Sequence, residues 1–299
     1  MGVVIAHVGV SESTEPQGST AHAAVAVARA LDGLGVARQE IDVLLDVGVY
    51  RDSNVVEPAN AALVQKAAGL NLDFPVAARP MFSFDLINGA CGLLNAVQVA
   101  RSLTDSGTAE RVLVVAADGH PSGQQQIEVE GSGFAHAPAA AALVLERAPD
   151  DRGFGPIAVR TADSDHAASG HVDIATMGSA GRSTLTVRHT AAAERAQLEL
   201  ATDLAIERMR EEQLSPDRTL LLAGTPFPSF ANELAWRIGT RHCQPRLAGP
   251  HRTVHTAALG CAYDEALRRG LLDEFDHLLF VTAGAGVSAA CGSYRIGPS

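Results

Sequence analysis

The sequence predicts an α/β protein made of two similar halves. Short apolar runs, such as residues 111–117 and 278–282, have the length and composition of buried strands. Between such runs lie longer alanine- and leucine-rich segments, several of which end at glycine, a common helix terminator. Apolar strands that alternate with helices are typical of parallel or mixed sheets. The fold class is therefore α/β, with helices covering the sheets.

Each element of the first half follows from its own pattern of residues. Runs rich in valine, isoleucine and leucine indicate strands, and periodic or alanine-rich segments closed by glycine indicate helices. We expect strands at residues 3–10, 41–49, 82–87, 111–117 and 140–146, helices at 20–34, 58–68 and about 92–103, and polar loops at 11–19, 50–57 and 118–132.

The second half shows a similar order of elements. We expect strands at residues 157–161, 220–223, 278–282 and 287–296, helices at 192–213, 231–241 and 256–269, and a long loop at 163–183. The segment from Cys91 matches the segment from Leu259 at a spacing of 168 residues, and the following strands match at a spacing of 166. Such a repeat implies two related halves, 1–150 and 151–299, with a shared core. A chance similarity between alanine-, leucine- and valine-rich segments is the alternative.

Composition excludes several classes of function. The net charge is −11 at pH 7 and only 4% of the residues are aromatic, which argues against nucleic acid as a partner. No apolar run approaches the ~18 residues of a membrane-spanning helix, and the first residues lack the basic region of a signal peptide. The cysteines form no CxxC pair, so we expect no metal site and reduced thiols in a cytoplasmic protein; they are Cys91, Cys243, Cys261 and Cys291.

Cys91 lies where the strand at residues 82–87 turns through Asn88-Gly89-Ala90 into a helix. Unpaired N–H groups and the helix dipole favour a thiolate at such a position, so the pKa of a thiol there can be lowered. The flanking glycines, Gly89 and Gly92, allow another group to approach the sulfur closely. Cys91 is therefore either a nucleophile on a strand-to-helix turn or a small buried residue that fills a tight turn.

The stretch Phe84-Asp-Leu-Ile-Asn-Gly-Ala-Cys-Gly92 is similar to the nucleophile motif of β-ketoacyl-ACP synthase III, a family of the thiolase superfamily. Residues 111–118, 264–270 and 283–286 resemble its next strand, C-terminal helix and glycine-rich turn, so the resemblance covers almost the whole chain. It implies a five-layered αβαβα thiolase fold, a homodimer and an acyl group carried on Cys91 as a thioester. It also implies acyl-CoA or an acyl carrier protein as substrate, no permanently bound cofactor, and an oxyanion hole formed by the backbone N–H groups of Cys91 and Ala285.

Two catalytic residues of this family are not matched. Its members use a histidine and an asparagine to bind and decarboxylate a malonyl unit. Residues 224–230 contain no histidine where the family has one, and Thr253 stands where the asparagine is expected. His251 and His255 lie near that position, and either could act as a general base towards a hydroxyl or amine acceptor at neutral pH. The alternative for each histidine is a surface or helix-capping role.

Three hypotheses follow from these residues. The first is an acyltransferase of the synthase III type, which loads an acyl group onto Cys91 and passes it to an acceptor in fatty-acid or polyketide-type metabolism. The second is a decarboxylating ketosynthase in which His251, His255 or other donors replace the missing pair. The third is a catalytically silent partner subunit, similar to a chain-length factor. A histidine within hydrogen-bond reach of Cys91 would favour the enzymes, and a buried, closed-off Cys91 would favour the silent subunit.

Overall fold

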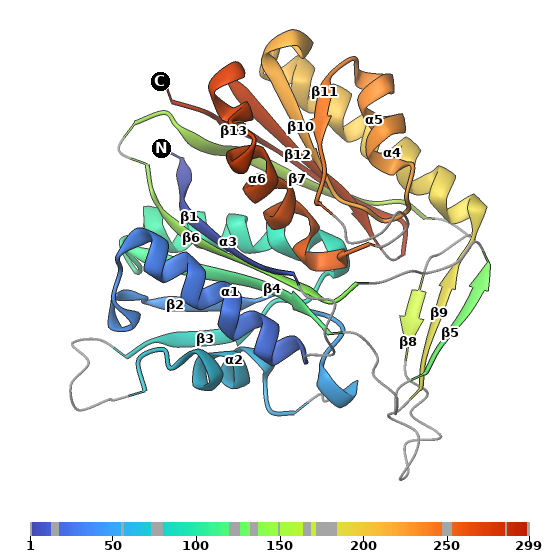
Figure 1. The fold of residues 1–299 in the computed structure, drawn as a ribbon. Helices are drawn as coiled ribbons and strands as arrows, with labels where there is room; N and C mark the ends of the chain where they lie inside the picture. The colour runs from blue at the N-terminus through green and yellow to red at the C-terminus, as the bar shows by residue number, and fades with distance from the viewer. Residues whose placement is uncertain are drawn as a thin grey trace.

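Strands and helices alternate along the chain, as the sequence predicts (Figure 1). The computed structural model describes residues 2–12, 18–54, 57–72, 80–119, 126–131, 137–148, 150–163, 169–171, 184–246, 253–284 and 286–297. The part up to residue 148 contains β1 (Val3–Glu12), α1 (Ser19–Leu34), β2 (Val43–Asp46), α2 (Asn60–Ala68), β3 (Phe82–Asp85), α3 (Gly92–Asp105), β4 (Arg111–Asp118), β5 (Gln126–Gly131) and β6 (Ala139–Arg147). The part from residue 150 contains β7 (Gly153–Thr161), β8 (Ser169–His171), β9 (Thr184–His189), α4 (Ala191–Glu211), β10 (Thr219–Ala223), α5 (Phe230–Ile238), β11 (Arg241–Cys243), α6 (Ala258–Arg268), β12 (His277–Gly284) and β13 (Ser288–Arg295).

Ten of the described strands form one continuous sheet whose order is palindromic. The order is β11-β10-β12-β13-β7-β1-β6-β4-β2-β3. The three strands at each end are parallel, and the strands between them are antiparallel. A single antiparallel residue pair, Val3 with Phe154, joins β1 to β7 in the middle. Each half of the sheet therefore repeats the topology of the other half.

Equivalent elements of the two halves begin 166 residues apart. This spacing relates η3 (Gly89–Cys91) to η7 (His255–Ala257), α3 to α6, and β4 to β12. The spacing of 168 expected for the helices is wrong, because it rested on matching Gly92 with Gly260. These glycines make different contacts: an added Cβ would lie 3.2 Å from the Val47 Cβ at Gly92, but 2.4 Å from the Ala141 Cβ at Gly260.

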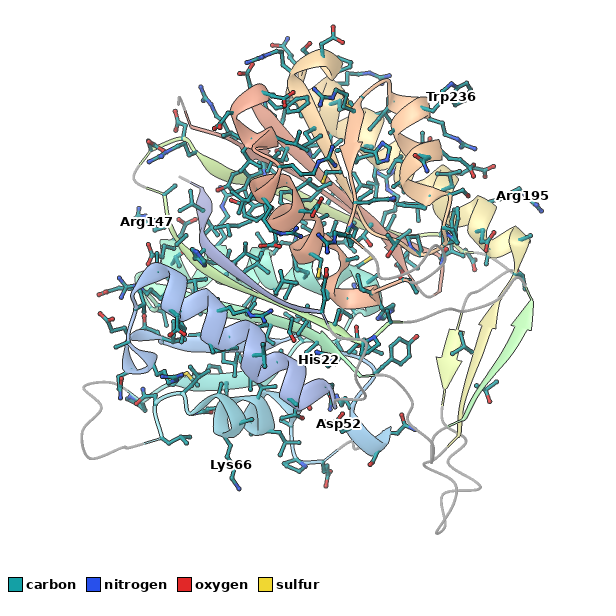
Figure 2. The ribbon with its side chains drawn as sticks, in the orientation of Figure 1. His22, Asp52, Lys66, Arg147, Arg195 and Trp236 are labelled. Atoms are coloured by element: carbon teal, nitrogen blue, oxygen red, sulfur yellow. The ribbon has the colours of Figure 1, made fainter. Side chains whose placement is uncertain are left out.

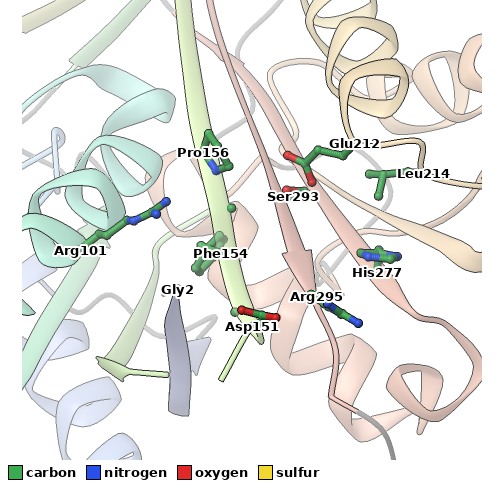
Figure 3. A pocket seen from close by; sticks show the side chains of 12 residues that line it. Gly2, Arg101, Asp151, Phe154, Pro156, Glu212, Leu214, His277, Ser293 and Arg295 are labelled. Carbon is green, nitrogen blue, oxygen red and sulfur yellow. The ribbon is translucent and has the colours of Figure 1, made fainter. Parts of the chain in front are cut away.

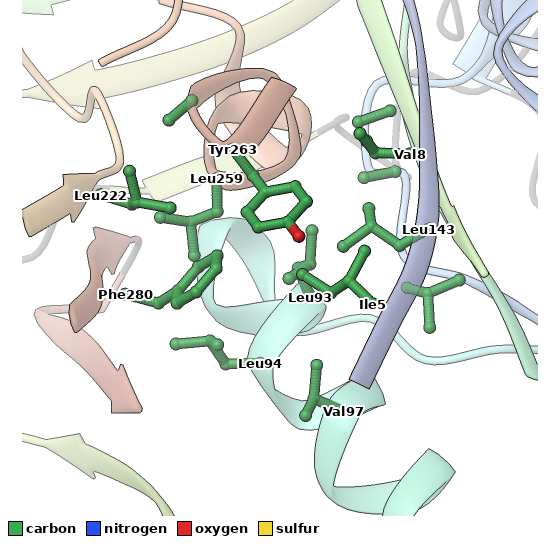
Figure 4. Packing of buried hydrophobic residues seen from close by; sticks show 14 of the residues in the cluster. Ile5, Val8, Leu93, Leu94, Val97, Leu143, Leu222, Leu259, Tyr263 and Phe280 are labelled. Atoms are coloured by element: carbon green, nitrogen blue, oxygen red, sulfur yellow. The ribbon is translucent and has the colours of Figure 1, made fainter. Parts of the chain in front are cut away.

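Three apolar clusters divide the molecule into five layers. One cluster joins α1 and α2 to the outer face of the first half of the sheet, and another joins α4 and α5 to the outer face of the second half. The middle cluster contains α3 and α6 with the inner faces of both halves, and Figure 4 shows Leu93 and Leu94 of α3 near Tyr263 of α6 and Phe280 of β12. The predicted αβαβα arrangement is therefore confirmed. None of the described helices is both long and apolar enough to cross a membrane.

Two outer helices of the first half are capped by carboxylates from distant segments. Asp52, labelled near the start of α1 in Figure 2, accepts hydrogen bonds from the N–H groups of the first two residues of α1 at 2.5 and 3.2 Å. Asp85, at the end of β3, accepts from the first two N–H groups of α2 at 2.9 and 2.7 Å. Negative charge at a helix N-terminus satisfies unpaired donors and the helix dipole. These contacts fix both helices against the sheet.

Four short strands were not expected from the sequence. β5 and β8 lie inside predicted loops, β9 was not assigned, and β11 follows a helix that ends three residues earlier than predicted. β5, β8 and β9 pair only with one another, in a separate three-stranded sheet. β8 and β11 are only three residues long, so they leave little trace in local apolar patterning.

Asp46, the last residue of β2, is a buried carboxyl group on the same side of the sheet as α2. Its side chain is 0% exposed, and its Oδ2 accepts a hydrogen bond of 2.9 Å from Asn60 Nδ2. Its Oδ1 has no hydrogen-bond partner among the described residues. Burial raises the pKa of this carboxyl to about 7, despite the hydrogen bond from Asn60. Asp46 therefore ionises inside the protein at a much higher pH than in the unfolded chain.

This shift predicts how an Asp46→Asn substitution changes stability with pH. Between pH 4 and 7 the unfolded chain has released the proton that the folded chain retains, so wild-type stability falls as pH rises. The variant lacks this loss, so its free energy of unfolding should rise relative to that of the wild type by about 3 kcal/mol between pH 4.5 and 8. Urea denaturation at both pH values measures the gain. Asp217→Asn, at an exposed position, is the control, and an equal difference at both pH values would contradict the burial of a titrating Asp46.

Candidate active site

Cys91 ends the turn η3, which leads from β3 into α3, so it lies at the predicted strand-to-helix turn. Its side chain is 0% exposed and belongs to the middle apolar cluster. Burial raises the pKa of its thiol to about 12. The expectation of a lowered pKa is wrong, because desolvation of the thiolate outweighs the helix dipole at this position. The thiol is therefore neutral at pH 7 and needs a base in order to act as a nucleophile.

The backbone around Cys91 is held by its own turn and by the end of β12. The Cys91 N–H donates a 3.0 Å hydrogen bond to the Asn88 carbonyl oxygen. Gly284, the last residue of β12, borders this turn, since an added Cβ at Gly284 would lie 3.3 Å from the Ala90 nitrogen. The second expected oxyanion donor, Ala285, follows directly in the chain but lies outside the described residues.

The turn η7, the equivalent of η3 in the second half, contacts η3 directly. Its first residue is His255, whose φ of +41° lies in the left-handed region, as does the φ of +51° at the equivalent Gly89. Such a backbone favours glycine, and a side chain held there often marks a functional site. The His255 side chain is 15% exposed, and its Nδ1 lies 3.3 Å from Asp118 Oδ2. Its ring centroid is 4.8 Å from that of Tyr50.

Asp118, the last residue of β4, accepts hydrogen bonds from both halves of the molecule. Its Oδ1 accepts from the N–H groups of Val49 and Tyr50 at 2.8 and 2.7 Å. Its Oδ2 accepts from the Thr256 N–H at 3.0 Å and from the Thr256 hydroxyl. Hydrogen bonds of this kind favour the ionised carboxylate, which can only accept. The proton on His255 is therefore placed on Nδ1, facing Asp118, and the lone pair is on Nε2.

Two threonines meet where the resemblance predicts a catalytic histidine and asparagine. The Oγ1 atoms of Thr225, after β10, and Thr253, before η7, are 3.1 Å apart. Thr253 Oγ1 also accepts the His255 N–H at 3.1 Å. The threonine pair therefore supports the left-handed backbone at His255. Sequence reasoning missed Thr225, although its place directly after a buried strand was a usable signal.

The described part of the chain tests the predicted site residues unevenly. His255 lies beside the turn that carries Cys91, but no hydrogen bond joins the two side chains within the described residues. His251 lies outside the described residues, as does Ala285. The structure pairs Asp118 with His255. No group of three metal-binding side chains occurs within the described residues.

A cavity of about 310 Å³ lies at the other end of the sheet from Cys91 (Figure 3). It is lined by side chains at the start of β7 and β12, by Arg295 at the end of β13 and by Arg101 of α3. β12 begins at this cavity with His277 and ends beside the Cys91 turn with Gly284, about 23 Å away for an extended strand of this length. The cavity is therefore separate from the candidate site.

Comparison with protein-family models matches residues 84–163 to 3-oxoacyl-[acyl-carrier-protein] synthase III, the family that the sequence resembles. The matched residues include Cys91, α3 and β4. No curated protein sequence matches the chain significantly.

Solved structures match the chain over its whole length. The synthase III of Aquifex aeolicus is 17% identical with a TM-score of 0.78, covering 98% of this chain and 100% of its own. The priming β-ketosynthase of the R1128 polyketide pathway is 18% identical with a TM-score of 0.78, covering 99% and 96%. OleA of Xanthomonas campestris, solved with lauric acid and lauroyl-CoA, is 14% identical with a TM-score of 0.77, covering 99% and 99%. The chain therefore has the thiolase fold, and it is similar to 3-oxoacyl-[acyl-carrier-protein] synthase III, as its sequence predicts.

Proposed function

We propose that the protein is an acyltransferase of the synthase III type. It takes an acyl group from a CoA or carrier-protein thioester onto Cys91 and passes it to an acceptor in fatty-acid or polyketide-type metabolism. The observation that supports this best is the Asp118–His255 pair, held beside the turn that carries Cys91. The fold match to synthases, and to OleA solved with lauroyl-CoA, supports an acyl thioester as the substrate class.

In the first step the Cys91 sulfur attacks the carbonyl carbon of the thioester. Because burial keeps the thiol neutral, a base must take its proton during the attack. His255 is that base, since Asp118 holds the proton on Nδ1 and leaves the lone pair on Nε2. The carbonyl oxygen carries negative charge until the bond to the leaving sulfur breaks. The proton on His255 then passes to the departing thiolate.

In the second step the acceptor attacks the acyl group on Cys91. An acceptor hydroxyl or amine gives its proton to His255, which returns it to the cysteine sulfur as the thioester bond breaks. The product is an ester or an amide. Decarboxylating condensation requires donors that stabilise an enolate, and each missing donor of this kind typically costs about 100- to 1000-fold in rate. Thr225 and Thr253 stand where the family has its two donors, and their mutual hydrogen bond uses one of the two hydroxyl protons. At most one hydroxyl donor is left, which supports acyl transfer over condensation.

The burial of Cys91 supports a second candidate function. A fully buried thiol with a raised pKa and no hydrogen bond to His255 is the usual state of an inert structural cysteine. In this second function the chain is a catalytically silent subunit that shapes the product of a partner synthase. The acyltransferase, in contrast, requires the side chains that cover Cys91 to move when the thioester binds.

The edge of the sheet supports a homodimer as the working form. β3 is the last strand on its side of the sheet, so one row of its backbone groups has no partner strand in the described part of the chain. Phe82 at its start is 63% exposed, and Ile87 just after its end is 51% exposed. An apolar open edge is a template for pairing with another strand. Pairing of β3 with its copy would continue the sheet across two protomers.

The exposed surface of α5 is a candidate for the binding site of the donor carrier protein. Trp236 projects from α5 and is 84% exposed (Figure 2). The neighbouring Arg237 has no ion-pair partner within the described residues, whereas Arg241 is bound to Glu274 at 2.7 Å. An exposed aromatic ring beside an available cation suits an acidic carrier protein, and a solvated helix face is the alternative.

Intact-protein mass spectrometry tests the acyl-enzyme. The wild type is incubated with acetyl-, butyryl-, octanoyl- and lauroyl-CoA and with the same acyl groups on a carrier protein. We expect a mass increase equal to the acyl group in the wild type and none in Cys91→Ala, because only this sulfur carries the acyl group. Cys261→Ala is the matched control, since Cys261 is equally buried, and it should be acylated like the wild type. Absence of any mass increase in the wild type would transfer support to the silent subunit.

Substitution of the base should slow acylation without removing its site. We expect His255→Gln to lower the rate of Cys91 acylation by roughly 100-fold or more. Asp118→Asn should lower the rate as well, because the amide cannot hold the Nδ1 proton in the same way. Quenched-flow mass spectrometry measures both effects. His277→Gln, at the distant cavity, should behave as wild type, and an unchanged acylation rate in His255→Gln would remove His255 from the mechanism.

A charge on the open edge should dissociate the homodimer. Phe82→Glu places a carboxylate where two β3 strands would meet, and burying an unpaired charge at an interface is strongly unfavourable. We expect light scattering to show a dimer for the wild type and a monomer for Phe82→Glu. Trp236→Glu also charges an exposed aromatic position, on α5, and should remain dimeric. A dimeric Phe82→Glu would place the interface elsewhere.

A further inference from the structure

The side chain of Tyr50 packs against the imidazole of His255, a contact that the mechanism above does not use. The centroids of the two rings are 4.8 Å apart, and the ring planes are tilted by 48°. This distance lies within the range of roughly 4.5–7 Å that is typical of attractive aromatic pairs. The turn that begins with His255 contacts the turn that carries Cys91. A phenol ring therefore covers part of the proposed base close to the proposed nucleophile.

Hydrogen bonds hold the backbone of Tyr50 on both sides. Its N–H donates a 2.7 Å hydrogen bond to Asp118 Oδ1, and its carbonyl oxygen accepts one of 2.8 Å from the Gly119 N–H. The next residue, Arg51, has a side chain that is 13% exposed and binds Asp85 at 2.7 Å. An added Cβ at Gly119 would lie 3.4 Å from the Tyr50 carbonyl oxygen, so the two segments are in close contact. The ring of Tyr50 therefore projects from a fixed position.

The hydrogen bond to Asp118 does not fix the imidazole of His255 by itself. Its length of 3.3 Å exceeds the usual range of roughly 2.7–3.2 Å for an N–H donor. Asp118 Oδ2 also accepts from the Thr256 N–H at 3.0 Å and from the Thr256 hydroxyl, so the imidazole shares its acceptor with two closer donors. The left-handed backbone at His255 fixes where the side chain begins, but the torsion that turns the ring has a broad preference. A second contact on the imidazole is needed, and the ring of Tyr50 supplies it.

The hydroxyl of Tyr50 is not an alternative base. Burial, followed by the negative charge of Asp118, raises the pKa of this hydroxyl above its usual value. The phenol is therefore neutral at pH 7. A cation within about 6 Å of the centroid of such a ring is attracted by its quadrupole. The imidazole of His255 becomes a cation when it takes the thiol proton, so its contact with Tyr50 strengthens at that point.

We propose that Tyr50 is a positioning residue for His255, an inference that rests on the acyltransferase function proposed above. The phenol ring holds the imidazole towards Asp118, which keeps the lone pair on Nε2 available. The same ring stabilises the positive charge that forms as Cys91 gives up its proton. Asp118 binds the backbone of Tyr50 through one oxygen and the imidazole of His255 through the other, so one carboxylate sets the positions of both rings.

Nitrogen-15 NMR of the free protein at pH 8 measures the tautomer of His255 directly, and the signals missing from His255→Gln identify this residue. We expect the wild type and Tyr50→Phe to hold the proton on Nδ1. Tyr50→Leu should show both neutral tautomers, because an imidazole that can turn away from its acceptor populates both. Phe275→Leu is the matched control: the buried Phe275 ring lies 5.0 Å from the Arg241 guanidinium carbon, and its loss should leave the His255 signals unchanged. Retention of the Nδ1 tautomer alone in Tyr50→Leu would overturn the positioning role.

Single-turnover acylation of Cys91 measures the consequence for the rate, at several concentrations of the acyl-CoA that labels the wild type fastest. We expect Tyr50→Leu to lower the rate constant by roughly 10-fold and to change the half-saturating concentration by less than about threefold, with Tyr50→Phe within about twofold of the wild type. In a His255→Gln background, Tyr50→Leu should cause no further loss, because no base is left to position. A further loss in that background would reduce Tyr50 to a structural role.

The outcomes separate the role of Tyr50 from the proposed function. Tyr50→Met, with a longer and more flexible side chain, replaces Tyr50→Leu in both measurements if that variant does not fold. Wild-type protein that is never acylated would contradict the acyltransferase, and with it the inference. An acylated wild type with unaffected Tyr50 variants would contradict the role of Tyr50 alone.

Discussion

The hydrogen bonds of the buried Asp118 carboxylate join the two halves of the molecule at the candidate site. One oxygen accepts from the backbone that follows β2, and the other accepts from η7 of the second half. Removal of this acceptor would leave several buried donors unsatisfied, each at a cost of about 1–3 kcal/mol. The same carboxylate determines the tautomer of His255. The position of the η7 turn and the direction of the imidazole therefore both depend on this side chain.

Burial in the middle layer affects the chemistry of Cys91 in two opposite ways. Because α3 and α6 are covered on both sides by the sheet, water is excluded from the sulfur, and the pKa of the thiol rises to about 12. The same exclusion of water strengthens any hydrogen bond to a developing oxyanion. A nucleophile in this environment depends on a base nearby, and it gains from donors that are aligned before the substrate arrives. The proposed role of His255 corresponds to the first of these requirements.

Much of the fold was readable from the sequence, because its signals are local. Apolar runs mark the strands of the large sheet, and the turn at Cys91 follows from a strand, two glycines and a periodic helix that are adjacent in the chain. His255 was named as a candidate base because the family resemblance expects an asparagine near it in the chain, and the structure places it beside the turn that carries Cys91. The division at residue 150 and the roles of His251 and Ala285 stay predictions.

The remaining features depend on tertiary contacts and could not be read in advance. The pKa of Cys91 is set by side chains that approach it from both halves of the chain. The partner of His255 is 137 residues away, and the pairing of Thr225 with Thr253 spans 28 residues. Each of these contacts arises only when the chain has folded, so the sequence supplied candidates for the site but not its connections.

The turns η3 and η7 have equivalent backbones but different side chains. Ala257 occupies the place of Cys91, and His255 occupies the place of Gly89, with the same left-handed backbone. A duplicated unit that starts with two identical turns needs a change at only one position in each copy to place the proposed nucleophile on one turn and the proposed base on the other. Neither copy then holds both groups, and selection for the chemistry becomes selection for keeping the two copies in a single chain.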